Sequence, residues 1–307
     1  MKDEDSRKLK SGISGILVVD KPSGMTSHDV VAAIRKGTGL RRIGHTGTLD
    51  PRASGVLVVL IGPAVRLSDY LICEKKGYEA MIHFGSVSDT YDGDGNVVET
   101  GREAPEDEEE IMDAMEDFVG DIVQVPPAYS AKKIKGRKAY EMARNGEEVH
   151  LEGRPVTVYS FDFIEYNRPE LTADVLCSAG TYIRSIAHDL GEKLGCGAYL
   201  SALRRTRSGR FSLRDAVPLA DLQKAFEDGT WFKHLIPAAE ALDEYEEVVL
   251  SMEEEADVLH GRRIAAEEGD HDSIAKAVSE QGELIALLEF DSDAGEWQPK
   301  KVFYQCN

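Results

Sequence analysis

The chain has 307 residues, of which 42% are hydrophobic, and this length allows one large domain and a small one. Its longest apolar run, around residues 56–61, is far too short to span a bilayer, and the charged N-terminus lacks the apolar core of a signal peptide, so we expect a cytoplasmic protein with no membrane partner. The formal net charge of -20 at pH 7 argues at first against binding to nucleic acid, whose phosphates require a basic partner.

The N-terminal part predicts a loose tail over residues 1–11, followed by a strand and a helix. GILVVDKPSG (15–24) is an apolar run that ends at a proline, which is typical of a strand. Next come a capping residue, Thr26 or Ser27, and apolar residues at helical spacing, and we expect Gly37 to close this helix. The apolar face of the helix consists of Val30, Val31 and Ile34.

The segment GHTGTLDPRASGVLVVLIG (44–62) places one carboxylate, Asp50, between a Gly/Thr-rich turn and a strand. Pro51 pushes Asp50 toward extended geometry, and Gly44 and Gly47 permit a tight turn before it. VLVVLI predicts a short strand that is buried on both faces. Asp50 is therefore expected on a stiff turn at the rim of a core. An ordinary Asp-Pro turn is the alternative that this local pattern leaves open.

The next segments alternate between strands, turns and helices. AVRLSDYL predicts a short helix, and KGYEAMIHFG (76–85) a half-buried strand with alternate residues on one face. SDTYDGDGN is a turn-rich loop, and residues 106–119 predict a solvent-facing acidic helix. The inward residues of that helix are Ile111, Met115 and Phe118 or Val119.

The segment VPPAYSAKKIKGRKAY (125–140) predicts a loop rich in proline, lysine and tyrosine that leads into a helix stopping near Gly146. Residues 155–166 and 171–180 alternate as strands do. TYIRSIAHDLGEKLG then has apolar residues at helical spacing, with Gly195 as the stop.

Charge is distributed unevenly along the chain. Residues 236–307 contain 19 acidic and 5 basic residues, and residues 102–121 contain ten acidic residues and one arginine. Three basic clusters stand against this background: 35–42 with a net charge of +4, and 131–144 and 203–214 with +5 each. One such cluster is usually a solvated helix face, but three in an acidic chain favour a polyanionic ligand.

Several familiar motifs do not hold in this sequence. DGDGN begins at Asp92 like a calcium loop, but Val97 stands where that loop needs glycine, so an Asp/Gly hairpin is expected. Ser130 and Lys133 have S-x-x-K spacing without the companion motifs of that hydrolase chemistry. The sequence has no Walker loop, no G-x-S-x-G elbow and no histidine pair at metal-ligand spacing. Its four cysteines are widely spaced, which indicates reduced thiols.

The candidate that remains is Asp50, which needs burial or a partner to work near neutral pH. Arg184, in the first turn of its helix, is the best partner, because a guanidinium would keep the carboxylate ionised and oriented. A surface arginine is the alternative. Tyr78 and Tyr182 could stack on a base or belong to the core, and His45 could contact a base or only a turn.

Six segments, in order from about residue 14 to 214, resemble the TruB-type tRNA pseudouridine synthases. They are GILVVDKPSGMTSHDVV, GHTGTLDPRASGVLVV, KGYEA, QVPPAYSAKKIKGRKAYEMARNG, GTYIRSIAHDLG and LRRTRSGRF. The acidic segment ending in WQPKKVF resembles the small PUA-like RNA-binding module that closes these enzymes. Each motif alone is modest, and the six in register identify the family.

The resemblance implies an isomerase that flips out the uridine at position 55 of the tRNA T-loop and converts it to pseudouridine, without metal or organic cofactor. It places the single catalytic aspartate on Asp50, the tyrosine against the target base on Tyr78, and the arginine partner of the aspartate on Arg184. The supporting residues implied by the resemblance are Tyr182, His45, which helps to hold the flipped-out conformation, Leu203 in the uracil pocket, and Lys21 and Pro22 under the cleft. The sequence leaves open whether Asp50 acts as nucleophile or as base.

The segment 125–150 resembles the RNA-gripping insertion of the family. The candidate phosphate contacts are Lys132, Lys133, Lys135, Arg137 and Lys138 from this segment, and Arg204, Arg205 and Arg207 from the third basic cluster. The expected partner is the T-stem-loop of tRNA, bound by a monomer without an obligatory protein partner.

We expect an α+β fold in which a mixed, largely antiparallel central sheet is flanked by helices, as in pseudouridine synthases. The expected division is a catalytic domain over 12–235 and a β-rich, PUA-like domain over 236–307.

Two other functions stay open: the related dyskerin-type synthases use a guide RNA and protein partners, and an RNA chaperone would fold tRNA without modifying it. The strong acidity of the C-terminal module puts its own RNA contact in doubt.

Overall fold

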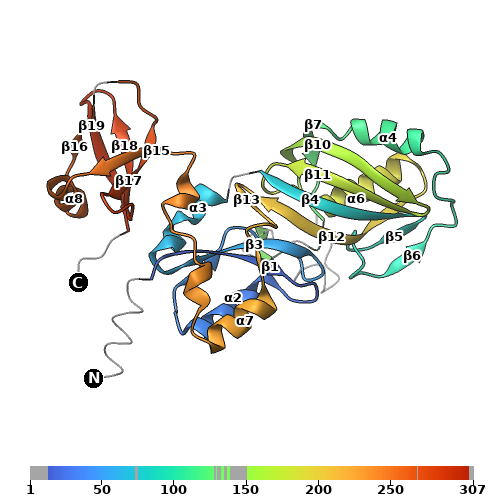
Figure 1. Cartoon of the computed structure of the whole chain (residues 1–307). Helices are drawn as coiled ribbons and strands as arrows, with labels where there is room; N and C mark the ends of the chain where they lie inside the picture. The colour runs from blue at the N-terminus through green and yellow to red at the C-terminus, as the bar shows by residue number, and fades with distance from the viewer. Residues whose placement is uncertain are drawn as a thin grey trace.

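The computed structural model describes residues 13–72, 75–127, 129, 151–267 and 269–303, and the backbone of residues 133–134 and 137–138. Its centre is a ten-stranded sheet in which most neighbours are antiparallel and two pairs, β1–β14 and β3–β12, are parallel (Figure 1). The expected mixed, largely antiparallel sheet is therefore confirmed. In sheet order the strands are β14 (Val217–Pro218), β1 (Gly15–Lys21), β3 (Ser54–Ile61), β12 (Ala198–Ser208), β4 (Lys76–Phe84), β11 (Glu170–Cys177), β10 (Arg154–Asn167) and β7 (Gly120–Gln124), with β2 (Ile43–His45) beside β3 and β13 (Phe211–Ser212) beside β12.

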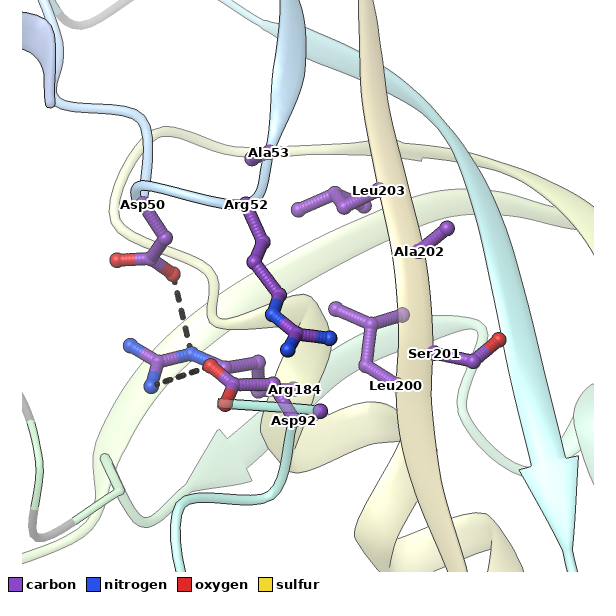
Figure 2. A pocket seen from close by; sticks show the side chains of 10 residues that line it. Asp50, Arg52, Ala53, Asp92, Arg184, Leu200, Ser201, Ala202 and Leu203 are labelled. Atoms are coloured by element: carbon purple, nitrogen blue, oxygen red, sulfur yellow. Dashed lines mark hydrogen bonds and ion pairs between the residues drawn. The ribbon is translucent and has the colours of Figure 1, made fainter. Parts of the chain in front are cut away.

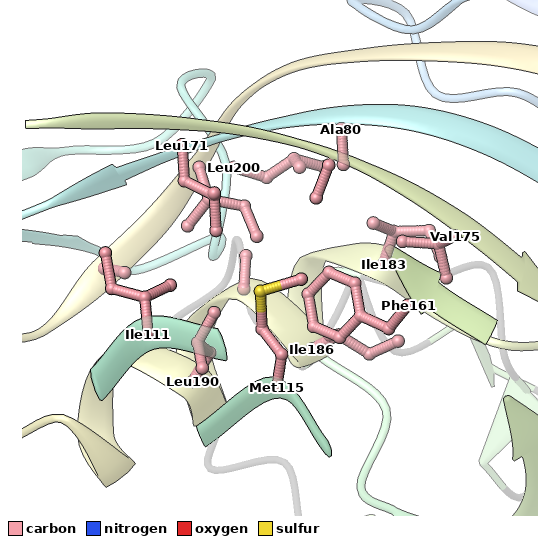
Figure 3. Packing of buried hydrophobic residues seen from close by; sticks show 14 of the residues in the cluster. Ala80, Ile111, Met115, Phe161, Leu171, Val175, Ile183, Ile186, Leu190 and Leu200 are labelled. Atoms are coloured by element: carbon pink, nitrogen blue, oxygen red, sulfur yellow. The ribbon is translucent and has the colours of Figure 1, made fainter. Parts of the chain in front are cut away.

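Two pairs of helices cover different parts of the sheet (Figure 1). Helices α2 (Ser27–Thr38) and α7 (Leu219–Glu227) pack on β1 and β3, and α4 (Glu108–Glu116) and α6 (Ile183–Lys193) pack on β4, β10, β11 and β12. Figure 3 shows the second core, where Ile111 of α4 and Ile186 of α6 face the strands. The two cores meet at Tyr78 of β4 and Leu203 of β12, which pack against both.

Strand β3 is buried on both faces, as its unbroken apolar run predicts. Leu57, Val59 and Ile61 belong to the core under α2 and α7. The alternate residues Val56, Val58 and Leu60 belong to a third core, which also contains Leu287 and Phe303 of the C-terminal segment. A strand fixed from both sides gives the turn before it, which carries Asp50, a rigid base.

Helix α2 begins where the sequence predicts and ends later. Thr26 is its N-cap, with a reciprocal capping box to Asp29. The expected stop at Gly37 is wrong, because the helix continues to Thr38 and closes at Gly39, which has a φ of 70°. Gly37 instead allows close packing against α7: a Cβ on Gly37 would lie 2.2 Å from the Phe226 ring.

The other elements follow the predicted order. AVRLSDYL forms a 3₁₀ turn, η1 (Gly62–Leu67), followed by α3 (Ser68–Leu71), and the Asp/Gly loop joins the hairpin strands β5 (Ser86–Ser88) and β6 (Val97–Glu99). Phe118 packs inward after α4, whereas the side chain of Val119 is exposed. In the segment 125–140 the backbone forms a short hairpin, β8 (Lys133–Ile134) and β9 (Arg137–Lys138). The N-terminal tail and the helix expected before Gly146 lie outside the described residues.

The C-terminal part is a separate five-stranded sheet with its own apolar core and one helix, α8 (Met252–Leu259), consistent with a PUA-like module. All five lysines and arginines after residue 236 are paired with carboxylates: Arg262 with Asp257, Arg263 with Asp291 and Glu296, Lys276 with Glu247, Lys300 with Glu289, and Lys301 with Asp69. The strands are β15 (Glu246–Leu250), β16 (Ile264–Ala265), β17 (Ile274–Ser279), β18 (Leu284–Asp291) and β19 (Glu296–Val302). None of the helices in the described part has the length and apolarity needed to cross a bilayer.

Candidate active site

Asp50 lies on the turn between β2 and β3, and three contacts fix this turn to the end of β1. The backbone N–H of Gly24 donates to the carbonyl of Pro51 over 2.8 Å, and the Lys21 Nζ donates to the same carbonyl over 3.1 Å. The Ser23 hydroxyl donates to the carbonyl of Arg52 over 2.8 Å. The stiff turn predicted from the sequence is thus confirmed, and it is held by hydrogen bonds to the β1 end as well as by its own proline.

Lys21 is the buried anchor of this arrangement. Its side chain is fully buried, and its Nζ also donates to the carbonyls of Pro22 and Met25, over 3.0 and 2.6 Å. Burial lowers the pKa of Lys21 to about 8, and the negative charge of Asp50 opposes this change. Lys21 therefore lies under the Asp50 turn as the structural support that the resemblance implies.

Arg184 lies beside Asp50, as the sequence predicts. Its Nε is 3.1 Å from Oδ2 of Asp50, and its Nη1 is 3.1 Å from Oδ2 of Asp92 (Figure 2). Arg184 is 6% exposed, in the first turn of α6, and it also donates to the carbonyls of Thr90 and Tyr129. One guanidinium thus joins two carboxylates from separate loops.

The two carboxylates differ in how many partners they have. Oδ1 of Asp92 accepts from the Thr90 hydroxyl over 2.6 Å and from the Asp94 amide over 3.0 Å, while Oδ2 accepts from Arg184, and the side chain is 13% exposed. Asp50 pairs with Arg184 through one oxygen among the described residues, and its side chain is 42% exposed. Asp92 is therefore fixed by several partners, and Asp50 is the less constrained and more exposed of the two carboxylates.

Burial and the neighbouring charges have opposing effects on the pKa of the Asp50 carboxyl. Desolvation raises its pKa above the ordinary value, and the neighbouring Asp92 and Asp94 charges act in the same direction, while Arg184 opposes them as the second-largest effect. A partly buried carboxylate that is oriented by an arginine and has a raised pKa suits a nucleophile or a general base.

Tyr78 lies across the sheet from Arg205, as its partner in the β4–β12 register. Burial raises the pKa of Tyr78, and a hydrogen bond and the charge of Arg205 oppose this effect. Arg205 is 2% exposed, and its guanidinium donates to the carbonyls of Val56 and Gly47, over 2.6 and 3.2 Å. The prediction that Arg205 contacts phosphate is therefore wrong. This arginine is buried, and its guanidinium contacts Tyr78 and the backbone around the Asp50 turn.

Leu203, His45 and Tyr182 are the other residues that the resemblance predicts to support the active site. Leu203 lines the pocket and packs between the two cores. His45 is half-buried on β2, and its Nδ1 accepts from the Gly47 amide over 3.3 Å, while burial lowers its pKa. Tyr182 is the N-cap of α6, and Gln124 binds both its N–H and its carbonyl, over 2.7 and 3.0 Å. These contacts place the backbone of α6 but give no side-chain contact of Tyr182 with Asp50.

The pocket itself is small in this form. It is lined by both carboxylates and Arg184 on one side and by residues 200–203 of β12 on the other (Figure 2). Its water-sized space is about 20 Å³, which is room for about one water. Arg52 contributes to the lining and pairs with Asp94 over 2.5 Å, with more than half of its side chain exposed. An aromatic ring entering this pocket must displace side chains at the mouth, and Arg52 is a long, exposed side chain among them.

The other expected phosphate contacts lie in different settings. Arg204 pairs with Asp20 over 2.8 Å, and Arg207 is exposed on the same strand. Lys133, Arg137 and Lys138 are in the hairpin β8–β9, whose side chains lie outside the described residues, as do Lys132 and Lys135 entirely. Their contacts with RNA stay predictions.

Sequence reasoning missed Asp92, which it treated only as a turn residue. The signal that could have found it is the density of aspartates in a loop that has no calcium-binding pattern. In the described part of the chain, no three His, Cys, Asp or Glu side chains are grouped as a metal site.

Two family models match consecutive parts of the chain. Residues 35–183 match the TruB family pseudouridylate synthase (N terminal domain), and residues 184–254 match the tRNA pseudouridylate synthase B C-terminal domain.

Curated relatives align over nearly the whole chain. The tRNA pseudouridine synthase B of Dehalococcoides mccartyi is 39% identical over 293 residues, covering 95% of this chain and 97% of the relative. That of Arthrobacter sp. is 42% identical over 310 residues, covering 96% and 98%. That of Corynebacterium efficiens is 49% identical over 214 residues, covering 68% and 72%.

Two similar solved structures are complexes. An H/ACA RNP bound to a substrate RNA containing 2′-deoxyuridine gives a TM-score of 0.72 at 29% identity, covering 95% of this chain and 85% of the other. A Cbf5-Nop10-Gar1 complex gives a TM-score of 0.73 at 30% identity, covering 97% and 87%.

Proposed function

The chain belongs to the TruB family of pseudouridine synthases, which are isomerases, and from this premise we propose that it converts the uridine at position 55 of the tRNA T-loop to pseudouridine. The observation that carries the proposal is Asp50, a partly buried carboxylate held by Arg184 at the mouth of a pocket, with one oxygen free of protein partners among the described residues. The names of the curated relatives support tRNA as the substrate.

The reaction rearranges one nucleotide and needs no co-reactant to balance. The bond from N1 of uracil to C1′ of the ribose breaks, a bond from C5 to C1′ forms, the proton on C5 is released, and N1 regains a proton. Asp50 is the one group we assign to the reacting atoms, as nucleophile or as base. Arg184 keeps it ionised, and Asp92 fixes Arg184 from the other side.

The position of Asp50 in the pocket requires that the target uridine leaves its base stack. Asp50 lies at the pocket mouth and can reach a sugar only if the nucleotide is everted, at a cost of a few kcal/mol. The apolar wall formed by Leu200 and Leu203 offsets this cost by contact with the ring, and Tyr78 packs against the same core as these leucines. Because the unliganded space is only about 20 Å³, we propose that Arg52 moves aside when the uracil enters.

We assign RNA affinity to the basic surface beside the pocket. Arg205 and Arg207, two positions apart in the third basic cluster, test this assignment. Arg207→Ala removes an exposed charge, so we expect weaker binding of a T-stem-loop RNA and a salt dependence whose slope falls by about one. Arg205→Met removes a buried arginine, so the salt slope should not change, while turnover and stability should fall. Filter binding over a salt series measures both variants. Equal slopes for Arg207→Ala and the wild type would exclude Arg207 as a phosphate contact.

Tritium release from 5-labelled uridine tests the reaction directly. The purified chain alone should release tritium from a T-stem-loop RNA and from a bare tRNA transcript, and it should not do so when the only labelled uridine lies outside the T-loop. Tight binding without release would favour an RNA chaperone. Release that requires a guide RNA or protein partners would favour the dyskerin-type alternative.

A further inference from the structure

Tyr91, the residue before Asp92, has an unusual backbone. Among the described residues it is the one non-glycine residue with a positive φ, at 64°. A bulky side chain in this region is strained, and the conformation persists only where the surroundings fix it. The surroundings here are hydrogen bonds: the Tyr91 N–H donates to Ser88, the Leu200 N–H donates to the Tyr91 carbonyl, and the Gly93 N–H donates to the Leu200 carbonyl.

The ring of Tyr91 lies flat against His188 of α6. Their ring centroids are 3.9 Å apart and the planes differ by 6°. Nδ1 of His188 is also the one buried side-chain polar atom without a hydrogen-bond partner in the described part of the chain. An unpaired buried nitrogen is unfavourable, so the Nδ1 edge of this imidazole is not held by a hydrogen bond, and the ring contact with Tyr91 holds its face.

The stack joins the two elements that hold the active-site arginine. His188 lies four residues after Arg184, so both side chains project from one face of α6. Tyr91 directly precedes Asp92, whose Oδ2 is 3.1 Å from Nη1 of Arg184. The Tyr91 loop and α6 are therefore connected by the Asp92–Arg184 ion pair, by the hydrogen bond from Arg184 to the Thr90 carbonyl, and by the stacked rings.

We propose that the Tyr91–His188 stack is a positioning contact for catalysis. It locks the Asp92 loop to α6, so that Asp92 holds the guanidinium of Arg184 in the rotation that presents Nε to Asp50. This inference rests on the proposed function, because it assigns a task only if the Asp50–Arg184 pair is the reacting site. His188 acts through its ring, and its protons take no part.

Variants that separate the ring from the backbone strain test the proposal. Tyr91→Gly relieves the strain of the positive φ but removes the ring. Tyr91→Phe keeps both the ring and the strain. We expect Tyr91→Gly and His188→Ala to lose about tenfold in kcat with KM unchanged, because the contact orients groups and does not bind RNA. Tyr91→Phe and His188→Phe should retain kcat, and His188→Phe should lose no thermal stability, since it removes the unpaired nitrogen.

A matched control and a double variant complete the test. His83→Ala alters another His–Tyr contact, with Tyr199, at 5.3 Å, and should leave kcat unchanged. In an Asp92→Asn background, Tyr91→Gly should add no further loss, because the loop no longer acts on Arg184 through a charge. Three results would overturn the proposal. The first is that the losses of kcat from Tyr91→Gly and Asp92→Asn multiply in the double variant, and the second is an unchanged kcat in Tyr91→Gly. The third is a His188→Phe variant that is as impaired as His188→Ala.

Hydrogen exchange keeps this test separate from the proposed reaction. The Leu200 amide, which donates to the Tyr91 carbonyl, should exchange faster in Tyr91→Gly than in Tyr91→Phe. If the wild type releases no tritium, the proposed function fails while this exchange difference can still appear. If the wild type is active and the exchange rates are equal, only the positioning role fails.

Discussion

Asp50→Asn is expected to abolish pseudouridine formation while the protein still binds its RNA. Asparagine keeps the shape of the side chain but can neither attack as an anion nor accept a proton, and such groups contribute about 10²–10⁴-fold or more to rate. The cationic surface is untouched, so the Kd for a T-stem-loop RNA should change little. Single-turnover tritium release and filter binding measure the two quantities on the same preparation.

Although Asp50→Asn removes activity, it should increase stability relative to the wild type as the pH rises. Burial raises the pKa of Asp50, so the native chain binds the proton more tightly than the unfolded chain. The contribution of Asp50 to stability therefore falls as pH rises through this raised pKa. Asparagine cannot ionise, so the Tm of Asp50→Asn minus that of the wild type should be larger at pH 8 than at pH 4.

Asp94→Asn is the matched control for this prediction. It removes a carboxylate that pairs with Arg52, a residue lining the same pocket, and that has no contact with Arg184 among the described residues. Turnover should stay close to that of the wild type. If Asp94→Asn were as inactive as Asp50→Asn, negative charge at the pocket mouth, and not the Asp50 carboxylate, would be the requirement.

The local pattern around Asp50 was sufficient to predict its turn, because the determinants are adjacent: the proline, the glycines and the two-sided strand lie within one segment. Placement of Arg184 beside it was also predictable, since helical spacing fixes the start of α6. Its role as partner of Asp50 was the favoured interpretation of the residues, with a surface arginine as the alternative, and the family resemblance implied the same role. The mixed sheet followed from the order of alternating segments.

Residues whose roles depend on irregular or distant pairing could not be predicted in this way. Arg205 and Arg207 would share a face of a regular strand, but a register shift between them in the β4–β12 pair leaves one buried and the other exposed. Asp92 reaches Arg184 only because its loop bonds to Leu200 of β12, a contact set by the topology of the sheet. Gly37 was assigned to a helix end because sequence alone does not show the Phe226 ring that requires it.

Arg184 is the residue whose removal should change the pH dependence of the reaction as well as its rate. Its charge opposes the burial that raises the pKa of Asp50. In Arg184→Gln that opposition is lost, so the pKa of Asp50 rises further and the carboxylate form is lost at a higher pH as the solution is acidified. The acid limb of the kcat/KM profile should therefore move to higher pH, with a loss of about 10²–10³-fold at pH 7 because Asp50 is also no longer oriented.

Arg184→Lys separates charge from geometry. Lysine retains a positive charge near Asp50, so the acid limb should lie closer to that of the wild type, but one ammonium cannot reproduce the fork by which Nε and Nη1 hold Asp50 and Asp92. We expect kcat to stay low while the pH profile is largely restored. Arg168→Gln, which removes an exposed arginine paired with Glu103 and Glu106, controls for net charge and should move neither quantity. An acid limb that stays in place in Arg184→Gln would mean that Asp50 ionises independently of the arginine, and the ion pair would then be structural only.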